Sequence, residues 1–265
     1  MSVKTRDAAY EFETTFDRAA QDYENSRPEY CRQLYCDLMV YQPIGQQSEV
    51  LEIGAGTGKA TGPILKTGCR LTALEPGKSL AKIAKEKYRD DERFLLRQEK
   101  LQDFECAGES FDLIYAATAF HWIEEEYGYA RVFDLLKPGG AFARFAYHAG
   151  EDESRPDLAR EIRAAYSRCS GMPGKGRSFD ETDAQALAMR ACRFGFTDPV
   201  WRIYRMKKDF SADGYMRLLR TYPDHMGLEA DERRRLTDSI YEAIKQHGGT
   251  VTVYYTIDME LIRKP

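Results

Sequence analysis

The chain lacks any cysteine arrangement that would staple a small secreted domain or hold a metal ion. Its six cysteines are scattered over 265 residues, and none forms a Cys-x-x-Cys pair. A chain of this length buries enough apolar surface to fold without disulfides, so we expect free thiols in a reducing compartment. The four histidines also lack the spacing of metal ligands, and we expect no metal cofactor.

Long apolar runs and a strong charge of one sign are missing as well. No run approaches the roughly 20 apolar residues of a membrane helix, and the N-terminus is polar where a signal peptide would be apolar. Acidic and basic residues nearly balance, with a net charge of −4, which argues against a nucleic-acid backbone as the main partner. These absences predict a cytoplasmic protein with no nucleic-acid or membrane partner, either a monomer or a homodimer.

The most informative segment that is present covers residues 50–59, Val-Leu-Glu-Ile-Gly-Ala-Gly-Thr-Gly-Lys. A short apolar run that carries Glu52 is followed by glycines at alternate positions, Gly54, Gly56 and Gly58. This pattern is typical of a buried parallel strand that ends in a tight turn, where glycine lets the backbone approach a ligand. The helix expected next would point its N-terminal N–H groups at the same place. We therefore predict a nucleotide-type cofactor site.

Strands and helices alternate between residues 49 and 148, which predicts a doubly wound parallel sheet of the α/β class. Two helices over residues 14–41, joined near Pro28, precede the sheet, and two more strands with helical insertions follow it. We expect a helical lid at 1–45, a cofactor-binding core at 46–148, and a substrate cap with the closing strands of the same sheet at 149–265. The expected strands are 49–53, 70–74, 94–98, 111–116, 141–147, 195–207 and 250–262, with a sharp turn at 137–140.

Three cofactor classes compete for the glycine turn. A P-loop requires Ser or Thr after its lysine, but Ala60 follows Lys59, so that reading fails. A dinucleotide fingerprint would place its third glycine at Lys59, whereas it occurs one place earlier, which weakens that reading without excluding it. S-adenosylmethionine carries no phosphate and needs only backbone contacts. Glu75, about 20 residues after the turn, can accept hydrogen bonds from the ribose of either remaining cofactor.

Four motifs, in this order and spacing, resemble those of class I S-adenosylmethionine-dependent methyltransferases. They are Glu-x-Gly-x-Gly-x-Gly at 52–58, Leu-Glu-Pro at 74–76, Phe-Asp-Leu-Ile at 111–114 and Leu-Lys-Pro-Gly-Gly at 136–140. Ala-Phe-His-Trp at 119–122 and Tyr-x-x-x-Arg-Pro-x-Tyr at 23–30 resemble the small-molecule branch that includes trans-aconitate methyltransferase. The resemblance covers about residues 16 to 148. It implies a Rossmann-like seven-stranded sheet with an antiparallel last strand.

The resemblance also implies the cofactor contacts. Glu75 would bind the ribose, and Arg27 in the lid would pair with the methionine carboxylate. Glu52 would either fix the turn or reach the methionine ammonium through water. Lys100 departs from the small residue that the family often has at this position. The implied contacts with S-adenosylmethionine are Tyr23, Arg27, Glu52, Gly54, Ala55, Gly56, Gly58, Glu75, Pro76, Glu99, Lys100, Leu101, Ala116, Ala117 and Thr118.

His121 is the candidate for the chemistry of transfer. A hydroxyl or amine acceptor needs a base near neutral pH, which histidine can provide. A carboxylate acceptor needs no base and would instead need an arginine to hold its neighbours. The alternative role for His121 is a hydrogen bond to the loop backbone only. The residues expected to bind the acceptor are His121, Trp122, Tyr147, His148, Arg220, Tyr222 and His225.

We therefore expect a methyltransferase that moves a methyl group from S-adenosylmethionine, by in-line displacement, to a small-molecule acceptor. By the trans-aconitate resemblance a carboxylate comes first, and a hydroxyl or ring carbon second. An inactive S-adenosylmethionine- or S-adenosylhomocysteine-binding protein, acting as a sensor or partner subunit, is the alternative, because the glycines and Glu75 only bind. A nicotinamide oxidoreductase comes third, disfavoured by Lys59.

Overall fold

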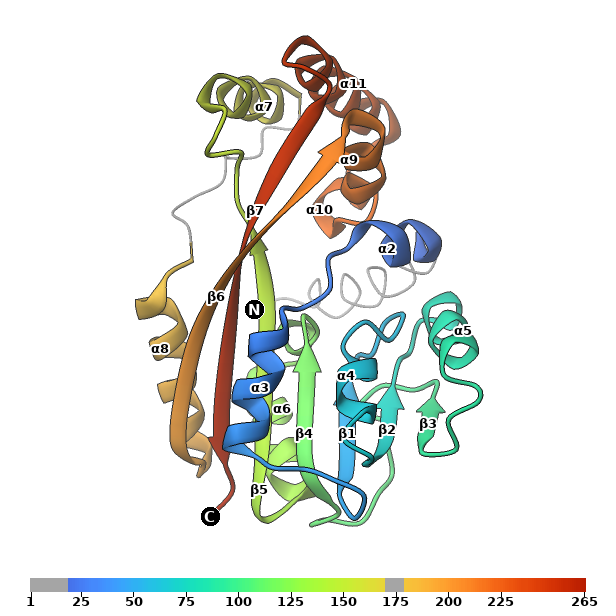
Figure 1. Cartoon of the computed structure of the whole chain (residues 1–265), viewed down its shortest axis with the longest axis vertical. Coiled ribbons are helices and arrows are strands. Elements are labelled where there is room, and N and C mark those ends of the chain that lie inside the picture. The colour runs from blue at the N-terminus through green and yellow to red at the C-terminus, as the bar shows by residue number, and fades with distance from the viewer. Residues whose placement is uncertain (1–18, 170–178) are drawn as a thin grey trace. The chain divides into compact units, whose positions relative to one another are not determined.

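The computed structural model describes residues 19–169 and 179–265, so residues 14–18 of the first expected helix lie outside it (Figure 1). The strands are β1 (Glu49–Ile53), β2 (Arg70–Leu74), β3 (Phe94–Arg97), β4 (Phe111–Ala117), β5 (Leu136–Ala149), β6 (Thr197–Ser211) and β7 (Thr250–Arg263). The helices are α2 (Ala20–Ser26), α3 (Arg32–Tyr41), α4 (Thr61–Leu65), α5 (Lys78–Lys87), α6 (Glu125–Leu135), α7 (Pro156–Cys169), α8 (Glu181–Ala191), α9 (Ala212–Leu219), α10 (Pro223–Met226) and α11 (Ala230–Gln246), and the 3₁₀ turns are η1 (Phe120–Trp122) and η2 (Cys192–Phe194).

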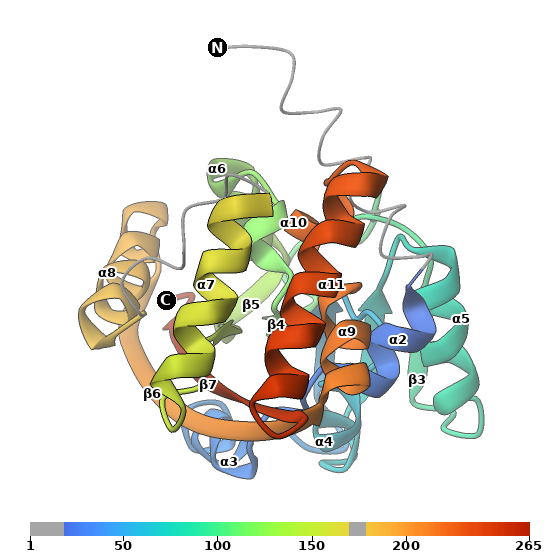
Figure 2. The ribbon, with the colours of Figure 1, turned by 90° about the horizontal axis from the view of Figure 1, so that it is seen from above.

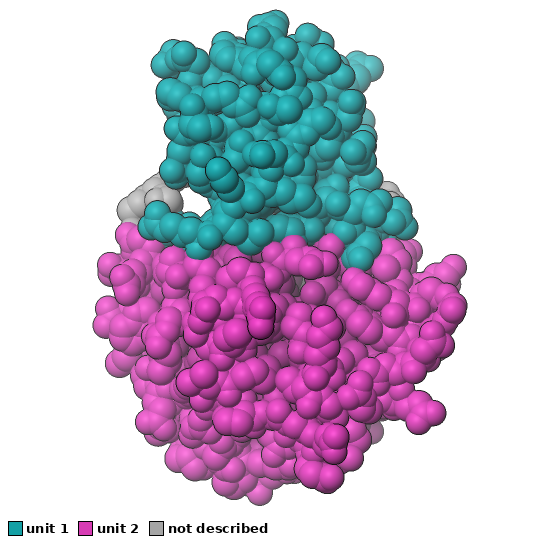
Figure 3. Space-filling model, viewed as in Figure 1, with its two compact units in different colours: residues 1–28, 148–179, 205–256 teal, residues 29–147, 180–204, 257–265 magenta. Residues whose placement is uncertain are grey.

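The chain divides into two compact units, which are coloured separately in Figure 3. Unit 1 comprises residues 1–28, 148–179 and 205–256, and unit 2 comprises residues 29–147, 180–204 and 257–265. Each unit is therefore assembled from three separate stretches of chain. The two are described one at a time below.

The seven strands form one sheet in the order β3-β2-β1-β4-β5-β7-β6. Strands β1 to β5 pair in parallel, whereas β7 runs against β5 in Figure 1. The strand order reverses at β1, which lies between β2 and β4, and in such sheets ligands bind at the carboxyl ends of the strands beside the reversal. The expected seven-stranded Rossmann-like sheet with an antiparallel last strand is confirmed.

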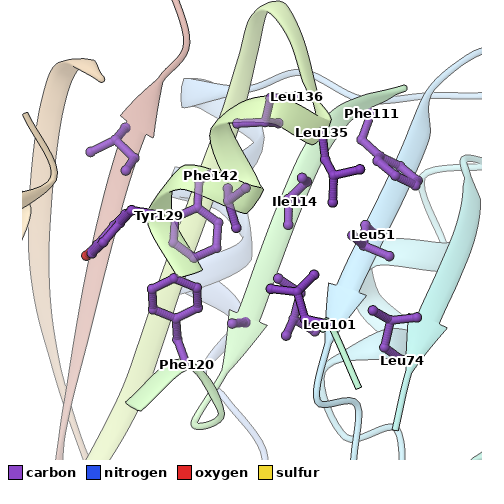
Figure 4. Packing of buried hydrophobic residues seen from close by; sticks show 14 of the residues in the cluster. Leu51, Leu74, Leu101, Phe111, Ile114, Phe120, Tyr129, Leu135, Leu136 and Phe142 are labelled. Atoms are coloured by element: carbon purple, nitrogen blue, oxygen red, sulfur yellow. The ribbon is translucent and has the colours of Figure 1, made fainter. Parts of the chain in front are cut away.

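One face of the parallel strands in unit 2 is covered by α6 and packs into a continuous apolar core (Figure 4). Leu51 of β1, Ile114 of β4 and Phe142 of β5 are fully buried there. The rings of Phe120 and Tyr129 lie against Phe142, with centroids 4.8 and 6.1 Å away. This packing anchors η1, and with it the chain that leaves β4, on the sheet.

The opposite face of the same strands is covered by α3 and α4, which lie across the sheet from α6 in Figure 2. Tyr35 of α3 and Tyr115 of β4 both pack against Phe145 of β5. Glu52 of β1 is in register with Tyr115 and shares this face, and both residues are fully buried. An acid and a phenol are therefore enclosed together just before the glycine turn.

The expected sharp turn at 137–140 was wrong. Strand β5 begins at Leu136 and continues through this segment, with a register shift against β4. The Gly139 N–H donates to the Lys264 carbonyl, and the Gly140 carbonyl accepts from the Lys264 N–H, both at 2.9 Å. This pairing keeps the segment extended, and the positive φ of +77° at Gly139 absorbs the irregularity. The short α10 was not expected either, because four residues carry too little periodicity.

Unit 1 contains α2, α7, α9, α10 and α11. Helices α7 and α11 lie side by side in both views (Figures 1 and 2). In the loop before α7, the buried Asp152 accepts hydrogen bonds from the Thr252 N–H at 3.0 Å and the Ser154 N–H at 3.1 Å. The Arg155 guanidinium also forms an ion pair with this carboxylate, with Nη2 2.6 Å from Oδ2. This carboxylate fastens the loop to β7.

Unit 2 also encloses an ion pair on the α6 face of the sheet. Arg144 Nε of β5 lies 2.9 Å from Glu260 Oε2 of β7, and these side chains are 16% and 1% exposed. The Tyr129 hydroxyl donates to both oxygens of Glu260, at 3.1 and 3.2 Å. Burial raises the pKa of Glu260 to about 7, although Arg144 opposes the rise. Desolvation of both groups is costly, so the pair depends on each charge having its partner.

We expect Glu260→Ala to lower the free energy of unfolding by about 3–5 kcal/mol, because it leaves a buried guanidinium without its counter-charge. Urea unfolding above neutral pH, where Glu260 is ionised, measures the loss. The double variant Arg144→Met with Glu260→Leu removes both charges and should cost much less. A double variant as unstable as the single one would show that lost packing, and not the unpaired charge, sets the cost.

Candidate functional site

The glycine turn joins β1 to α4 and has a left-handed backbone. Gly54, Gly56 and Gly58 have φ values of +70°, +58° and +75°, which glycine adopts without the strain of a Cβ. The N–H groups of Gly54 and Ala55 both donate to the Leu74 carbonyl at 2.9 Å. The turn is thereby tied to the carboxyl end of β2.

Two neighbouring side chains fill the space that a Cβ on the turn glycines would occupy. A Cβ added to Gly54 would come within 2.5 Å of the Ala119 Cβ, and one added to Gly58 within 2.6 Å of the Tyr88 ring. The Tyr88 hydroxyl also donates to the Gly58 carbonyl at 2.7 Å. The chain that leaves β4 and the end of α5 are therefore both held against the turn. Sequence analysis missed both contacts, because nothing in the pattern links these residues to the glycines.

Glu75 lies at the end of β2 and reaches the turn. Its Oε2 accepts from the Gly56 N–H at 2.7 Å and its Oε1 from the Gly77 N–H at 2.8 Å, and the residue is 6% exposed. A carboxylate oxygen can accept more than one hydrogen bond, so its bonds to the backbone do not by themselves prevent Glu75 from accepting ligand hydroxyls. Two acceptor oxygens side by side, next to a glycine-rich turn, fit the two hydroxyls of a ribose.

Glu52 lies at the other side of the turn, in the buried layer. Thr61 Oγ1 of α4 donates to its Oε2 at 2.5 Å, whereas its Oε1 has no hydrogen-bond partner among the described residues. Burial raises the pKa of Glu52 to about 7, and the nearby hydroxyls of Thr61 and Tyr115 oppose that rise. Thr61 was not foreseen as a partner, because α4 is too short for its faces to be read from the sequence.

The segment after β3 supplies three of the expected cofactor contacts. Glu99 pairs with Arg97 of β3, Oε1 to Nε, at 2.9 Å, and Lys100 is half-buried. The Leu101 side chain is 2% exposed in the α6-side core, so its backbone is the part that can meet a ligand. Pro76, after Glu75, is half-buried.

The chain leaves β4 through small residues at the same edge of the sheet. Ala116 is fully buried and in register with Ile53, the last residue of β1. Ala117 and Thr118 are half-buried. The carboxyl ends of β1, β2 and β4 thus meet at the glycine turn, as the expected cofactor contacts require.

The turn η1 carries the two exposed acceptor candidates of unit 2. Phe120 is 3% exposed, whereas His121 and Trp122 are exposed, with ring centroids 4.9 Å apart. Tyr147, near the end of β5, stacks on Tyr30 at 5.3 Å. His121 and Trp122 follow the carboxyl end of β4, and Tyr147 lies near that of β5.

The other six candidates belong to unit 1, where three of them form a cluster. Arg27 is 9% exposed, and its Nε and Nη2 donate to the Oγ1 and carbonyl of Thr221 at 2.9 and 2.6 Å. Its guanidinium carbon lies 4.4 Å from the Tyr222 ring centroid and 5.3 Å from that of Tyr23. The structure therefore brings the lid pair Tyr23 and Arg27 together with Tyr222.

The remaining three unit 1 candidates have separate surroundings. Arg220 Nε forms an ion pair with a carboxylate of α2 at 3.1 Å. His225 is 1% exposed, and its Nε2 lies 2.8 Å from the Tyr166 hydroxyl. The ring of His148 stacks on Phe179 at 4.0 Å.

Two further findings, on membrane-spanning helices and on metal sites, hold for the described residues, 19–169 and 179–265. Within these ranges no helix has both the length and the apolar character needed to cross a membrane. Nor do the same residues contain a group of three or more His, Cys, Asp or Glu side chains placed to hold a metal ion.

Several known proteins similar to this chain are named as methyltransferases. The family model described as a methyltransferase domain matches residues 50–140. An uncharacterised methyltransferase of Schizosaccharomyces pombe is 25% identical over 232 residues, 87% of each chain. One of Geobacillus kaustophilus is 30% identical over 180 residues, 59% of this chain and 81% of the relative. A solved structure named as a type II methyltransferase, from Anaeromyxobacter dehalogenans, matches with a TM-score of 0.61 at 20% identity, over 89% of this chain and 97% of the other.

Glu52 should make the stability of the fold depend on pH. Its pKa is about 7 in the folded protein against an ordinary value of 4.5, so the folded state binds more protons between these values. Its contribution to the free energy of unfolding therefore falls as pH rises through this window, and stays low above it.

We expect Glu52→Gln, which keeps an acceptor for Thr61 but has no charge, to gain stability over the wild type as pH rises from about 5 to about 8. Urea unfolding of both proteins across this range measures the difference. Other titrating groups, Glu260 among them, are common to both proteins and cancel. A difference that stays constant with pH would contradict the titration of Glu52.

Proposed function

This chain belongs to the class I S-adenosylmethionine-dependent methyltransferases, and we propose that it moves a methyl group from this cofactor to a small-molecule acceptor. The observation that carries the proposal is the buried Glu75 carboxylate at the end of β2, which bonds the Gly56 N–H at 2.7 Å and so places an acceptor of hydroxyl hydrogen bonds at the glycine turn. When bound, S-adenosylmethionine supplies a methyl group on a sulfonium and leaves as S-adenosylhomocysteine. The protein has to align the acceptor in line with that bond and exclude water.

In this proposal the glycine turn and the ends of three strands hold the cofactor. Glu75 accepts the ribose hydroxyls, and Pro76 flanks the adenine. Glu52 accepts a hydrogen bond from Thr61 and so supports the turn from the buried side. This bond favours a structural role for Glu52 over direct contact with the ligand. The further contacts that we propose in unit 2 are Gly54, Ala55, Gly56, Gly58, Glu99, Lys100, Leu101, Ala116, Ala117 and Thr118.

In this proposal the methyl acceptor binds beside η1. His121 is exposed there and can take a proton from a hydroxyl or amine acceptor near neutral pH. Trp122 beside it and Tyr147 on β5 offer apolar surface to the acceptor. Alignment of the reacting atoms can be worth ~7–11 kcal/mol of the barrier, so residues that position the acceptor matter as much as a base.

The chemical class of the acceptor follows from analogy alone. A carboxylate is the first candidate, by resemblance to trans-aconitate methyltransferase, and a hydroxyl is the second. The lid at 1–45 and the cap at 149–265 stay predictions from the sequence. So do the ligand contacts expected in unit 1, which are Tyr23, Arg27, His148, Arg220, Tyr222 and His225.

Formation of S-adenosylhomocysteine from S-adenosylmethionine, with a panel of small carboxylic acids, phenols and amines, tests the proposed function. We expect turnover with at least one class of acceptor. The rival is a protein that binds the cofactor but does not transfer the methyl group. Tight binding of S-adenosylmethionine without turnover on any acceptor would favour that rival, and this outcome would replace the proposal.

Glu75→Ala should weaken binding of S-adenosylmethionine by about 1.5–3 kcal/mol, since it removes a charged acceptor from the ribose hydroxyls. Isothermal titration calorimetry measures the affinity. Glu75→Gln, which keeps one acceptor oxygen, should fall between the two proteins. Glu92→Ala, an exposed acid of unit 2, is the control and should leave the affinity unchanged. Wild-type affinity in Glu75→Ala would remove the ribose assignment.

His121→Ala should lower turnover of a hydroxyl or amine acceptor by about 10²–10⁴-fold, the usual contribution of a positioned base. The affinity for S-adenosylmethionine should stay near normal, because the proposal gives His121 no cofactor contact. His247→Ala serves as a control, since that ring pairs with Glu161 in unit 1. Turnover that survives unchanged in His121→Ala would assign the ring to loop structure.

A further inference from the structure

Tyr30, in the connection between α2 and α3, has no role in the function proposed above. Its hydroxyl lies 2.5 Å from Thr118 Oγ1, and either group can donate the hydrogen bond. Its ring stacks on Tyr147 at 5.3 Å and meets Phe145 edge-on at 4.8 Å. All four residues belong to unit 2. Tyr30 is thus bonded to the end of β4 and packed on the end of β5.

The residue that Tyr30 bonds has an unusual backbone. Thr118 has a φ of +54°, a left-handed conformation that is an outlier for a β-branched side chain. Such a conformation persists only where its surroundings hold it. The Thr118 N–H donates to the Phe145 carbonyl at 2.7 Å, and the side-chain hydroxyl bonds Tyr30. Removal of the Tyr30 hydroxyl takes away one of these two restraints.

The left-handed turn at Thr118 determines where the following residues go. It directs the chain so that Ala119 touches the glycine turn, at the point where a Cβ on Gly54 would lie 2.5 Å from the Ala119 Cβ. Turn η1 begins at the next residue, with Phe120 buried and His121 exposed. The conformation of Thr118 therefore sets the position of η1 relative to the glycine turn.

We propose that Tyr30 is a positioning residue for methyl transfer: its hydroxyl holds Thr118 in the left-handed conformation that keeps η1 and His121 at the glycine turn. We call this pair the Tyr30–Thr118 latch. Its effect on catalysis rests on the proposed function. Its effect on the conformation of η1 does not, and can be measured without cofactor or acceptor.

The chain offers a matched control for the missing hydroxyl. Tyr35 also packs against Phe145, at 6.4 Å, and is 8% exposed. Its hydroxyl has no hydrogen-bond partner among the described residues. Tyr35→Phe therefore removes the same atom from a neighbouring ring without breaking a latch, whereas Tyr30→Phe breaks it.

Trp122 reports on η1 directly, because the chain has only two tryptophans and the other is Trp201. In a Trp201→Phe background, acrylamide quenching measures how far Trp122 is exposed to solvent. We expect Tyr30→Phe to raise the quenching constant by about half, with little change in melting temperature, and Tyr35→Phe to leave it unchanged. Hydrogen exchange of the Thr118 amide should be about tenfold faster in Tyr30→Phe alone.

Variants of Thr118 separate the latch from a general loss of packing. Thr118→Val keeps the β-branched shape but lacks the hydroxyl, so it should reproduce Tyr30→Phe. Thr118→Gly accepts positive φ without strain, so Tyr30→Phe should have little further effect in that background. Equal quenching and equal exchange in the wild type, Tyr30→Phe and Thr118→Val would overturn the proposal.

The catalytic part has its own readout. We expect kcat for methyl transfer to fall about tenfold in Tyr30→Phe, in line with the loss of one hydrogen bond, while affinity for S-adenosylhomocysteine changes less than about twofold. An equal fall in Tyr35→Phe would overturn the positioning role. A wild-type protein with no turnover on any acceptor would overturn the proposed function instead, and quenching and exchange would then decide the latch alone.

Discussion

The glycine turn after β1 is the constraint on which the rest of the structure depends. Because no side chain projects from Gly54 or Gly58, Ala119 and Tyr88 can lie in the space that a Cβ would occupy. The same absence lets the Glu75 carboxylate bond directly to the backbone of Gly56. Three strand ends and the end of α5 therefore converge on one short piece of backbone, and a Cβ on Gly54 or Gly58 would push Ala119 or Tyr88 away.

Two buried acids on opposite faces of the same sheet show two ways to accommodate a carboxyl group. Glu260 has a counter-charge in Arg144 and a donor in Tyr129. Glu52 has hydroxyl groups and no ion-pair partner among the described residues, and one of its oxygens has no hydrogen-bond partner there either. The first arrangement belongs to the packed core, and the second lies beside the glycine turn that we propose as the cofactor site. Stability is commonly given up at such functional positions.

The sequence was most informative where a structure depends on neighbouring residues. Strands β1 and β2 were predicted at their observed bounds, because buried parallel strands read as apolar runs that end in glycine or proline. The place of Glu75 followed from its position at the end of a strand. The doubly wound parallel sheet followed from the alternation of strands and helices, and the antiparallel last strand from the resemblance to the methyltransferase family.

What escaped prediction depends on residues far apart in the chain. The segment at 137–140 is extended because Lys264 pairs with it, and no local pattern reveals such a partner. The bonds of Thr61 to Glu52, Tyr88 to Gly58 and Tyr30 to Thr118 join residues with no periodic relation. The candidate cofactor residues could be named from motifs, but the side chains that hold them in place could not.

The assembly of unit 2 from three stretches of chain has a consequence for its synthesis. Residues 257–265 reach the ribosome exit long after β5, the strand beside which they lie. Until then β5 has an open edge, and Arg144 has no Glu260 to neutralise it. During synthesis, the edge strand β5 therefore stays unpaired and charged in water until β7 has been made. An open edge that carries a cation is less prone to pair with a neighbouring chain than an apolar one, so the charge of Arg144 disfavours such pairing until Glu260 is in place.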